Sequence, residues 1–286
     1  MQVHLFDGTY ELFRAWFGAP PAQHEGREVG ATRSVMRSLA MLIGRGTVTH
    51  LGVAFDHVIE SFRNDLFAGY KTGEGLDERL VSQFELVERA TAALGVMVWP
   101  MVEFEADDAI ATAAAALARD SSVDQVRIVS PDKDMCQCVE GARVVCWERF
   151  KDIVLDEPAV IAKHGVSPES IADMLGLVGD TADGIPGLEG WGKSSAGKVL
   201  TVYKHIEAIP DDVTKWNVPG LRGVDRLAAS LRDSRAEAML YKKLATLRVD
   251  CPITTNIDAL AWRGVNRSAL DAILDEIGLS KDAIKL

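Results

Sequence analysis

The residues with the clearest chemical potential are acids at the ends of apolar runs. Glu105, Asp107 and Asp108 fall within four positions, immediately before an alanine-rich segment, residues 109–118, that has the composition of a buried helix. A single acid there would suit the helix dipole as an N-terminal cap. Three acids together are costly without a cation. One helical turn places Glu105 and Asp108 on the same face, whereas Asp107 points elsewhere and could reach a second ion.

Further acids follow short apolar runs that have the length of buried strands. The alternation of such runs with helical segments predicts a mostly parallel sheet with both faces covered by helices, an α/β fold. Because right-handed crossovers bring the carboxyl ends of parallel strands to one edge, we expect these acids to gather there. They are Asp7 after residues 3–6, Asp56 after residues 51–55, and Asp132 and Asp134 after residues 127–129.

Two more acids, Asp180 and Asp183, lie three positions apart in the second half of the chain, where helical patterns replace strands. One helical turn would bring them together. So many carboxylates converge only around metal ions, and oxygen ligands without His or Cys favour Mg²⁺ or Mn²⁺. Two such ions about 4 Å apart are the usual device for in-line attack on a phosphodiester. The alternative interpretation is that the acids are scattered helix caps and surface charges.

The composition places limits on class and partners. With 286 residues, 48% hydrophobic and 26% charged, the chain is typical of a soluble globular protein of one large or two modest domains. A net charge of -11 weakens the case for a nucleic-acid partner, but bound divalent ions would cancel part of it locally. The four cysteines show no zinc spacing, and there is no signal peptide or membrane-spanning run. We therefore expect a cytoplasmic protein without a membrane partner.

Residues 187–194 fit the phosphate-binding P-loop pattern G-x-x-x-x-G-K-S. A P-loop follows a strand and opens a helix. Here the preceding residues, Asp183-Gly184-Ile185-Pro186, lie in a helical region. A P-loop NTPase is therefore the weaker interpretation of this stretch.

Several short motifs occur along the chain in a fixed order. They are Asp7, Phe55-Asp56, Ser61-Phe62-Arg63, Tyr70-Lys71, Glu105-Ala106-Asp107-Asp108, Ser130-Pro131-Asp132-Lys133-Asp134 and Gly179-Asp180-Thr181-Ala182-Asp183-Gly184-Ile185-Pro186-Gly187. In this order they resemble the flap endonuclease and 5′-3′ exonuclease family, in particular its bacterial branch, which includes the N-terminal nuclease domain of DNA polymerase I. The resemblance spans about residues 1–205.

The resemblance implies a division into two regions. A PIN-like nuclease core would occupy residues 1–165, with an arch segment near residues 57–80. A helical DNA-binding region would occupy residues 166–286, with a helix-three-turn-helix near residues 175–203. Because no polymerase domain is attached, we expect a stand-alone nuclease.

The resemblance also implies catalytic roles. Lys71 and Arg63 would orient and polarise the scissile phosphate, as an electrostatic clamp does at a developing charge. Two ions, Mg²⁺ or Mn²⁺, would be held by two groups of acids, with Asp132 shared between them. The first group would be Asp7, Asp56, Glu105, Asp107 and Asp108, and the second Asp132, Asp134, Asp180 and Asp183.

The stretch 187–196 is similar to the family's hairpin, whose glycines let backbone amides approach a phosphate and whose carbonyls can hold a K⁺. Ser194 and Ser195 stand where the family usually has Lys and then Thr, and Lys193 is displaced by one position. Glu74 stands where an arch Arg is common. The DNA-binding residues that the resemblance implies are Tyr70, Gly187, Gly190, Trp191, Gly192, Lys193, Ser194, Ser195 and Lys198.

The expected function is therefore that of a metal-dependent, structure-selective 5′ nuclease in DNA replication and repair. It would hydrolyse DNA phosphodiesters at 5′ flaps, as a flap endonuclease, and at 5′ ends, as a 5′-3′ exonuclease. Expected partners are branched or 5′-ended duplex DNA and RNA primers, and we expect a monomer. The alternative from another class is a catalytically silent DNA-structure-binding protein of the same fold, against which the complete set of acids argues.

Overall fold

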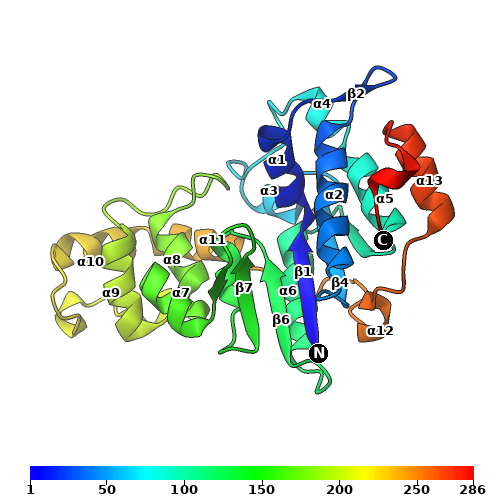
Figure 1. Cartoon of the computed structure of the whole chain (residues 1–286). Coiled ribbons are helices and arrows are strands. Elements are labelled where there is room, and N and C mark those ends of the chain that lie inside the picture. The colour runs from blue at the N-terminus through cyan, green and yellow to red at the C-terminus, as the bar shows by residue number, and fades with distance from the viewer. The chain divides into compact units, whose positions relative to one another are not determined.

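The structure is a computed structural model that describes residues 1–286. It contains two compact units, each built from segments that are separate in the sequence (Figure 1). Unit 1 contains residues 1–61, 73–130 and 248–286, and unit 2 contains residues 62–72 and 131–247. The sequence analysis instead divided the chain once, at residue 165, into two continuous regions. That division stays a prediction.

The centre of unit 1 is a run of parallel strands in the order β5-β4-β1-β6. In the central strand β1, Val3, Leu5 and Phe6 are fully buried, as expected for a strand with helices on both faces. The register pairs Asp7 at the end of β1 with Ala54 of β4, so these strands end at the same edge. The strands are β1 (Gln2–Asp7), β4 (Leu51–Asp56), β5 (Met97–Met101) and β6 (Gln125–Val129).

Helices flank these strands. The helix α6 lies against all of them, and its small side chains Ala109 and Ala113 are fully buried there. The helices of unit 1 are α1 (Gly8–Gly18), α2 (Gly30–Gly44), α4 (Glu78–Val81), α5 (Phe84–Ala93), α6 (Ala106–Leu117), α12 (Ile257–Leu260), α13 (Arg267–Glu276) and the 3-10 helix η5 (Lys281–Ala283). A short antiparallel ribbon joins β2 (Gln23–His24) to β3 (Arg27–Glu28). The mostly parallel, helix-covered sheet expected from the sequence is confirmed.

Unit 2 is mainly helical. Helix α8 packs on α9 and α11, and Asp173 inside this contact is fully buried 2.8 Å from the Lys242 ammonium. The helices are α3 (Phe62–Leu66), η1 (Asp134–Cys138), α7 (Glu157–His164), η2 (Pro168–Ser170), α8 (Ile171–Val178), α9 (Lys193–Tyr203), η3 (Ile206–Ala208), η4 (Val213–Lys215), α10 (Val224–Asp233) and α11 (Arg235–Ala245). An antiparallel pair, β7 (Val144–Glu148) and β8 (Ile153–Leu155), completes it.

Side-chain hydrogen bonds fix the chain at two places in unit 1. Helix α1 begins directly after Asp7, because the Asp7 side chain accepts a hydrogen bond from Tyr10 N and caps the helix. The segment of residues 247–253 is irregular. Its amides instead donate to side chains, Arg248 N to Asp108 and Cys251 N to Thr112.

No helix in the structure is both long enough and apolar enough to span a membrane.

Residues 80–94 span two helices rather than one. Helix α4 ends at Val81 and α5 begins at Phe84. Between them, the fully buried Gln83 accepts hydrogen bonds from Thr32 N at 3.0 Å and Thr32 Oγ1 at 3.1 Å. Gln83, which lies at the interruption, thus attaches this corner of the chain to α2.

Candidate functional site

Two of the predicted acids stand at the carboxyl ends of the neighbouring strands β1 and β4. Asp7 Oδ1 accepts a hydrogen bond from Tyr10 N at 2.8 Å, and Oδ2 accepts one from Ser130 Oγ at 3.0 Å. Asp56 Oδ1 accepts a hydrogen bond from Ala106 N at 2.7 Å, at the start of α6. The strand order therefore brings both carboxylates to one edge, and local donors fix their orientation.

The three acids before α6 differ in their surroundings. Glu105 and Asp108 form a capping box: Glu105 N donates to Asp108 Oδ2 at 3.0 Å. Glu105 Oε1 also accepts a hydrogen bond from Ser61 Oγ at 2.8 Å. Asp108 is fully buried, and its Oδ1 accepts a hydrogen bond from Arg248 N at 2.8 Å. Backbone amides thus occupy both Asp108 oxygens, whereas Asp107 is half-buried in the first turn.

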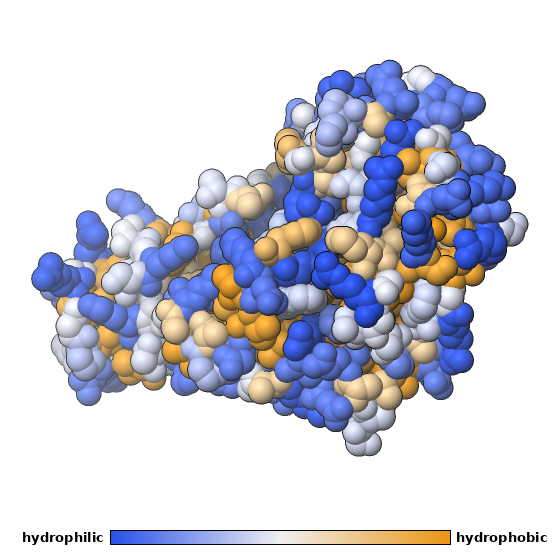
Figure 2. Space-filling model, in the orientation of Figure 1, coloured by the Kyte–Doolittle hydropathy of each residue, from blue (hydrophilic) through white to orange (hydrophobic).

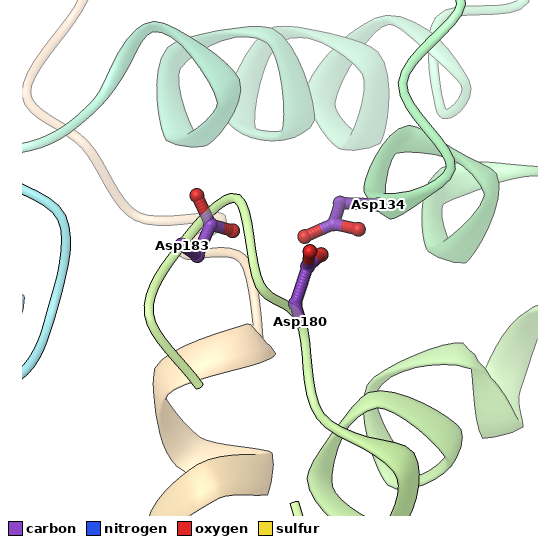
Figure 3. A group of neighbouring side chains, drawn as sticks. All are labelled: Asp134, Asp180 and Asp183. Carbon is purple, nitrogen blue, oxygen red and sulfur yellow. The ribbon is translucent and has the colours of Figure 1, made fainter. Parts of the chain in front are cut away.

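In unit 2, Asp134, Asp180 and Asp183 lie together, with one carboxylate oxygen of each within 4.8 Å of the others. Figure 3 shows the carboxylates of Asp134, from η1, and Asp180, from the loop after α8, turned toward each other. The spacing of Asp180 and Asp183 suggested that they share one helical turn, but in the structure they do not. Helix α8 ends at Val178, and a bridge in which Asp180 and Ile185 exchange backbone hydrogen bonds of 2.8 Å folds the loop back.

The electrostatics of this cluster favour a cation. Asp134 Oδ1 is buried and accepts no hydrogen bond. Burial, and then the charge of Asp132, raise the pKa of Asp134 well above its usual range. Burial by itself would lower the pKa of Lys133, but the charges of Asp134, Asp180 and Asp132 outweigh it and raise that pKa. A buried carboxylate oxygen without a donor is a suitable ligand for a hard cation, so the cluster fits a divalent ion with oxygen ligands.

Lys71 lies beside the same cluster. Its Nζ is 3.0 Å from Asp183 Oδ1, and its backbone N donates to Asp183 O at 3.0 Å. The two loops run unusually close, because a Cβ on Gly184, which has a φ of +74°, would lie 2.1 Å from Gly69 O. Only glycine permits this approach. The fold therefore fixes an ammonium next to a predicted metal ligand.

Arg63 and Tyr70 are buried in the same unit. Arg63 is 1% exposed, its Nε donates to Leu244 O at 2.7 Å, and its Nη2 donates to Thr246 O at 3.1 Å. Tyr70 is 4% exposed, with its ring centroid 5.6 Å from Lys71 Nζ. Arg63 thus holds the end of α11, and Tyr70 packs beneath Lys71. Direct contact of either side chain with a phosphate stays a prediction.

The predicted hairpin precedes α9. Ser195 Oγ accepts a hydrogen bond from Gly192 N at 3.0 Å and donates one to Gly192 O at 2.9 Å, and so closes the start of α9. Lys193 and Ser194 are exposed, whereas Trp191 is buried, with its ring centroid 6.3 Å from that of Trp216. The hairpin follows helix α8 and a turn rather than a strand. The P-loop interpretation is therefore wrong.

Two residues near these sites are absent from the set expected from the sequence. Lys133 pairs with Asp180, and its position between Asp132 and Asp134 in one motif was the available signal. Arg226, in α10, lies against Gly190 of the hairpin. No pattern in the sequence links these two distant positions.

Family models match both parts of the chain. Residues 2–165 match the "5'-3' exonuclease, N-terminal resolvase-like domain", and residues 166–268 match the "5'-3' exonuclease, C-terminal SAM fold". The expected PIN-like core and helical C-terminal region are confirmed. The helix-three-turn-helix stays a prediction.

Sequence relatives are DNA polymerases I. That of Bacillus caldotenax is 31% identical over 280 residues, which cover 96% of this chain and 31% of the relative. That of Rhizobium leguminosarum is 33% identical over 283 residues, which cover 95% of this chain and 27% of the relative. The chain thus spans about a third of the length of these relatives.

Solved structures share the fold. T5 5′-exonuclease with bound divalent metal ions (zinc) has a TM-score of 0.67 at 19% identity, with 97% of this chain and 98% of that chain covered. The catalytic core of Rad2 in complex with a DNA substrate has a TM-score of 0.62 at 13% identity, with 96% and 86% covered. At these identities the likeness shows the fold alone.

Proposed function

Because the chain belongs to the 5′-3′ exonuclease family, we propose that it is a metal-dependent, structure-selective nuclease acting on DNA at 5′ flaps and 5′ ends. The observation that carries this proposal is the cluster of Asp134, Asp180 and Asp183, with the Lys71 ammonium 3.0 Å from Asp183. Carboxylates that hold a cation beside a fixed ammonium are suited to stabilising the charge that develops on a phosphate under attack.

The proposed ligands form two groups, one for each ion. Asp132, Asp134, Asp180 and Asp183 would hold one ion, and Asp7, Asp56, Glu105, Asp107 and Asp108 the other. Oxygen-only ligands favour Mg²⁺ or Mn²⁺. A bound ion would supply an activated water and stabilise the leaving oxygen. Neighbouring groups orient the two carboxylates at the strand ends. Ser130 Oγ and Tyr10 N donate hydrogen bonds to Asp7, and Ala106 N donates one to Asp56.

Lys71 and Arg63 have different proposed roles. Lys71 would act on the reacting phosphate, because its side chain is 28% exposed and its ammonium is held beside Asp183. Such a charge stabilises the transition state more than the bound substrate. Arg63 is a positioning residue, because its guanidinium is buried on the carbonyls of Leu244 and Thr246.

The proposed partner is branched or 5′-ended duplex DNA, including RNA primers, in replication and repair. The hairpin and the start of α9 offer backbone amides, and Lys193 lies exposed among them, an arrangement that suits a phosphate group. The hairpin carbonyls would hold K⁺. We propose that the protein acts as a monomer.

A labelled 5′-flap duplex tests the proposal directly. We expect cleavage at the flap junction with Mg²⁺ or Mn²⁺ and none with EDTA. Asp180→Asn should bind the flap without cleaving it. Flap binding by wild type without cleavage in either metal would instead identify a catalytically silent DNA-structure binder of the same fold.

A further inference from the structure

The side chains around the hairpin divide into those used inside the protein and those left at the surface. Ser195 closes the start of α9, and the Lys198 ammonium donates to Gly220 O at 2.7 Å. The Ser195 hydroxyl has no proton left to donate to a DNA phosphate, and the Lys198 ammonium is held toward the Gly220 carbonyl. The hairpin also carries an exposed carboxylate, Glu189, which repels a phosphate. A cation that lies directly against the hairpin backbone would offset this charge.

Arg226 provides that cation from a distant part of the sequence. A Cβ built on Gly190, whose φ is +81°, would lie 3.3 Å from Arg226 Nε and 3.4 Å from Nη2. The guanidinium therefore lies against the hairpin backbone, where a larger side chain at position 190 would displace it. Helix α10 is attached to the hairpin at this point, because Ser230 Oγ donates to Glu189 O at 2.8 Å.

The surroundings of Arg226 leave it able to bind an anion. Arg232 pairs with Asp233 and Arg235 with Asp211, but Arg226 has no ion-pair partner in the structure and is exposed. Figure 2 shows mostly hydrophilic and neutral residues at the end of unit 2 that contains α9 and α10, on the left of the view. A polar, uncovered surface fits a phosphate backbone better than it fits an apolar partner.

We propose that Arg226 binds a phosphodiester of the duplex together with the amides at the start of α9. This inference rests on the proposed function, because it names a further residue with which the nuclease holds DNA. The planar guanidinium can donate two parallel hydrogen bonds to one phosphate, which a lysine cannot. Arg226 lies against the hairpin and is not among the proposed metal ligands, so its expected contribution is to binding rather than to the chemical step.

Binding of a fluorescent 5′-flap duplex to the full chain in EDTA, at several salt concentrations, tests this proposal. Arg226→Met should weaken binding roughly tenfold near ~0.1 M salt and reduce the slope of log Kd against log salt by about one. Arg226→Lys should recover part of the affinity. The matched control is Arg222→Met, which removes an equal charge from an exposed residue close by in the sequence.

A second readout separates binding from chemistry. At saturating DNA, Arg226→Met should cleave at the wild-type single-turnover rate. Equal losses of affinity in Arg226→Met and Arg222→Met would overturn the proposal, because they would reduce Arg226 to a general surface charge. A wild type that neither binds nor cleaves the flap would overturn the proposed function itself. If Arg226→Met bound the flap with wild-type affinity, the inference about Arg226 would be contradicted, whereas the proposed function would stand.

Discussion

Lys133 and Asp180 form an ion pair within the acid cluster, and Lys133 Nζ also lies 3.6 Å from Asp134 Oδ1. The Lys133 side chain is 30% exposed, so it reaches the carboxylates from a partly solvated position. An ammonium at this place lowers the negative potential that attracts a metal ion.

Lys133→Met should therefore bind Mn²⁺ more tightly, by roughly tenfold after allowance for solvent screening. Titration of free Mn²⁺ by electron paramagnetic resonance, without DNA, would measure this. Lys151→Met is the control, because Lys151 pairs with Glu148 and its side chain is 69% exposed. Weaker Mn²⁺ binding by Lys133→Met than by this control would mean that Lys133 supports the metal site.

Lys71→Ala should lower the single-turnover cleavage rate at saturating DNA far more than it weakens flap binding, by roughly a hundredfold. The reason is that a charge on the reacting phosphate acts mainly in the transition state. Lys204→Ala removes a comparable ion pair, the one with Glu169 at 2.8 Å, and should cleave normally. Equal rates for Lys71→Ala and wild type would remove Lys71 from the site.

Asp180→Asn and Asp183→Asn should abolish or greatly slow cleavage while the fold and flap binding persist. A capping role alone would cost about 1 kcal/mol of stability and leave activity nearly intact. Asp212→Asn is the matched control, because Asp212 accepts a bond from Thr214 N much as Asp180 accepts one from Ala182 N. Normal cleavage by Asp180→Asn across a Mn²⁺ titration would contradict the proposed ligand set.

Arg63→Met should lower the melting temperature, because it leaves the buried carbonyl of Leu244 and the partly buried carbonyl of Thr246 without their donor. The loss should be about 3 kcal/mol in the free energy of unfolding, because two carbonyls lose a charged donor. Any fall in cleavage should be explained by the smaller fraction of folded protein. If Arg63→Met were as stable as wild type and bound DNA without cleaving it, the result would support direct action of Arg63 on the reacting phosphate.

His4 gives the folded protein a pH dependence in unit 1. Burial in β1, and then the charge of Arg127, lower the pKa of His4 to about 4 from an ordinary value of 6.5. Between these two values the unfolded chain binds a proton that the folded chain does not, so stability should fall as the pH falls from about 6.5 to 4. This contribution is about 3 kcal/mol. Unfolding by urea at several pH values should show a shallower dependence in His4→Gln than in wild type.

The acids at the strand ends were predictable, because buried runs such as residues 3–6 and 51–55 have a clear length and composition. The way in which Asp180 and Asp183 converge with Asp134 was not. Their spacing suggested a helical turn, whereas the structure uses the Asp180–Ile185 bridge. Likewise, the hydrogen bond from Arg248 N to Asp108 joins positions that no local pattern relates.

The return of residues 248–286 to unit 1 has a consequence for the order of events during synthesis. The amides of Arg248 and Cys251, which pair with Asp108 and Thr112 on α6, leave the ribosome after most of the chain. Unit 2 is complete once residue 247 has emerged. Because domains generally fold as units during translation, the helical unit can close first. The unit that carries Asp7, Asp56 and the α6 acids is complete only after the final segment has emerged.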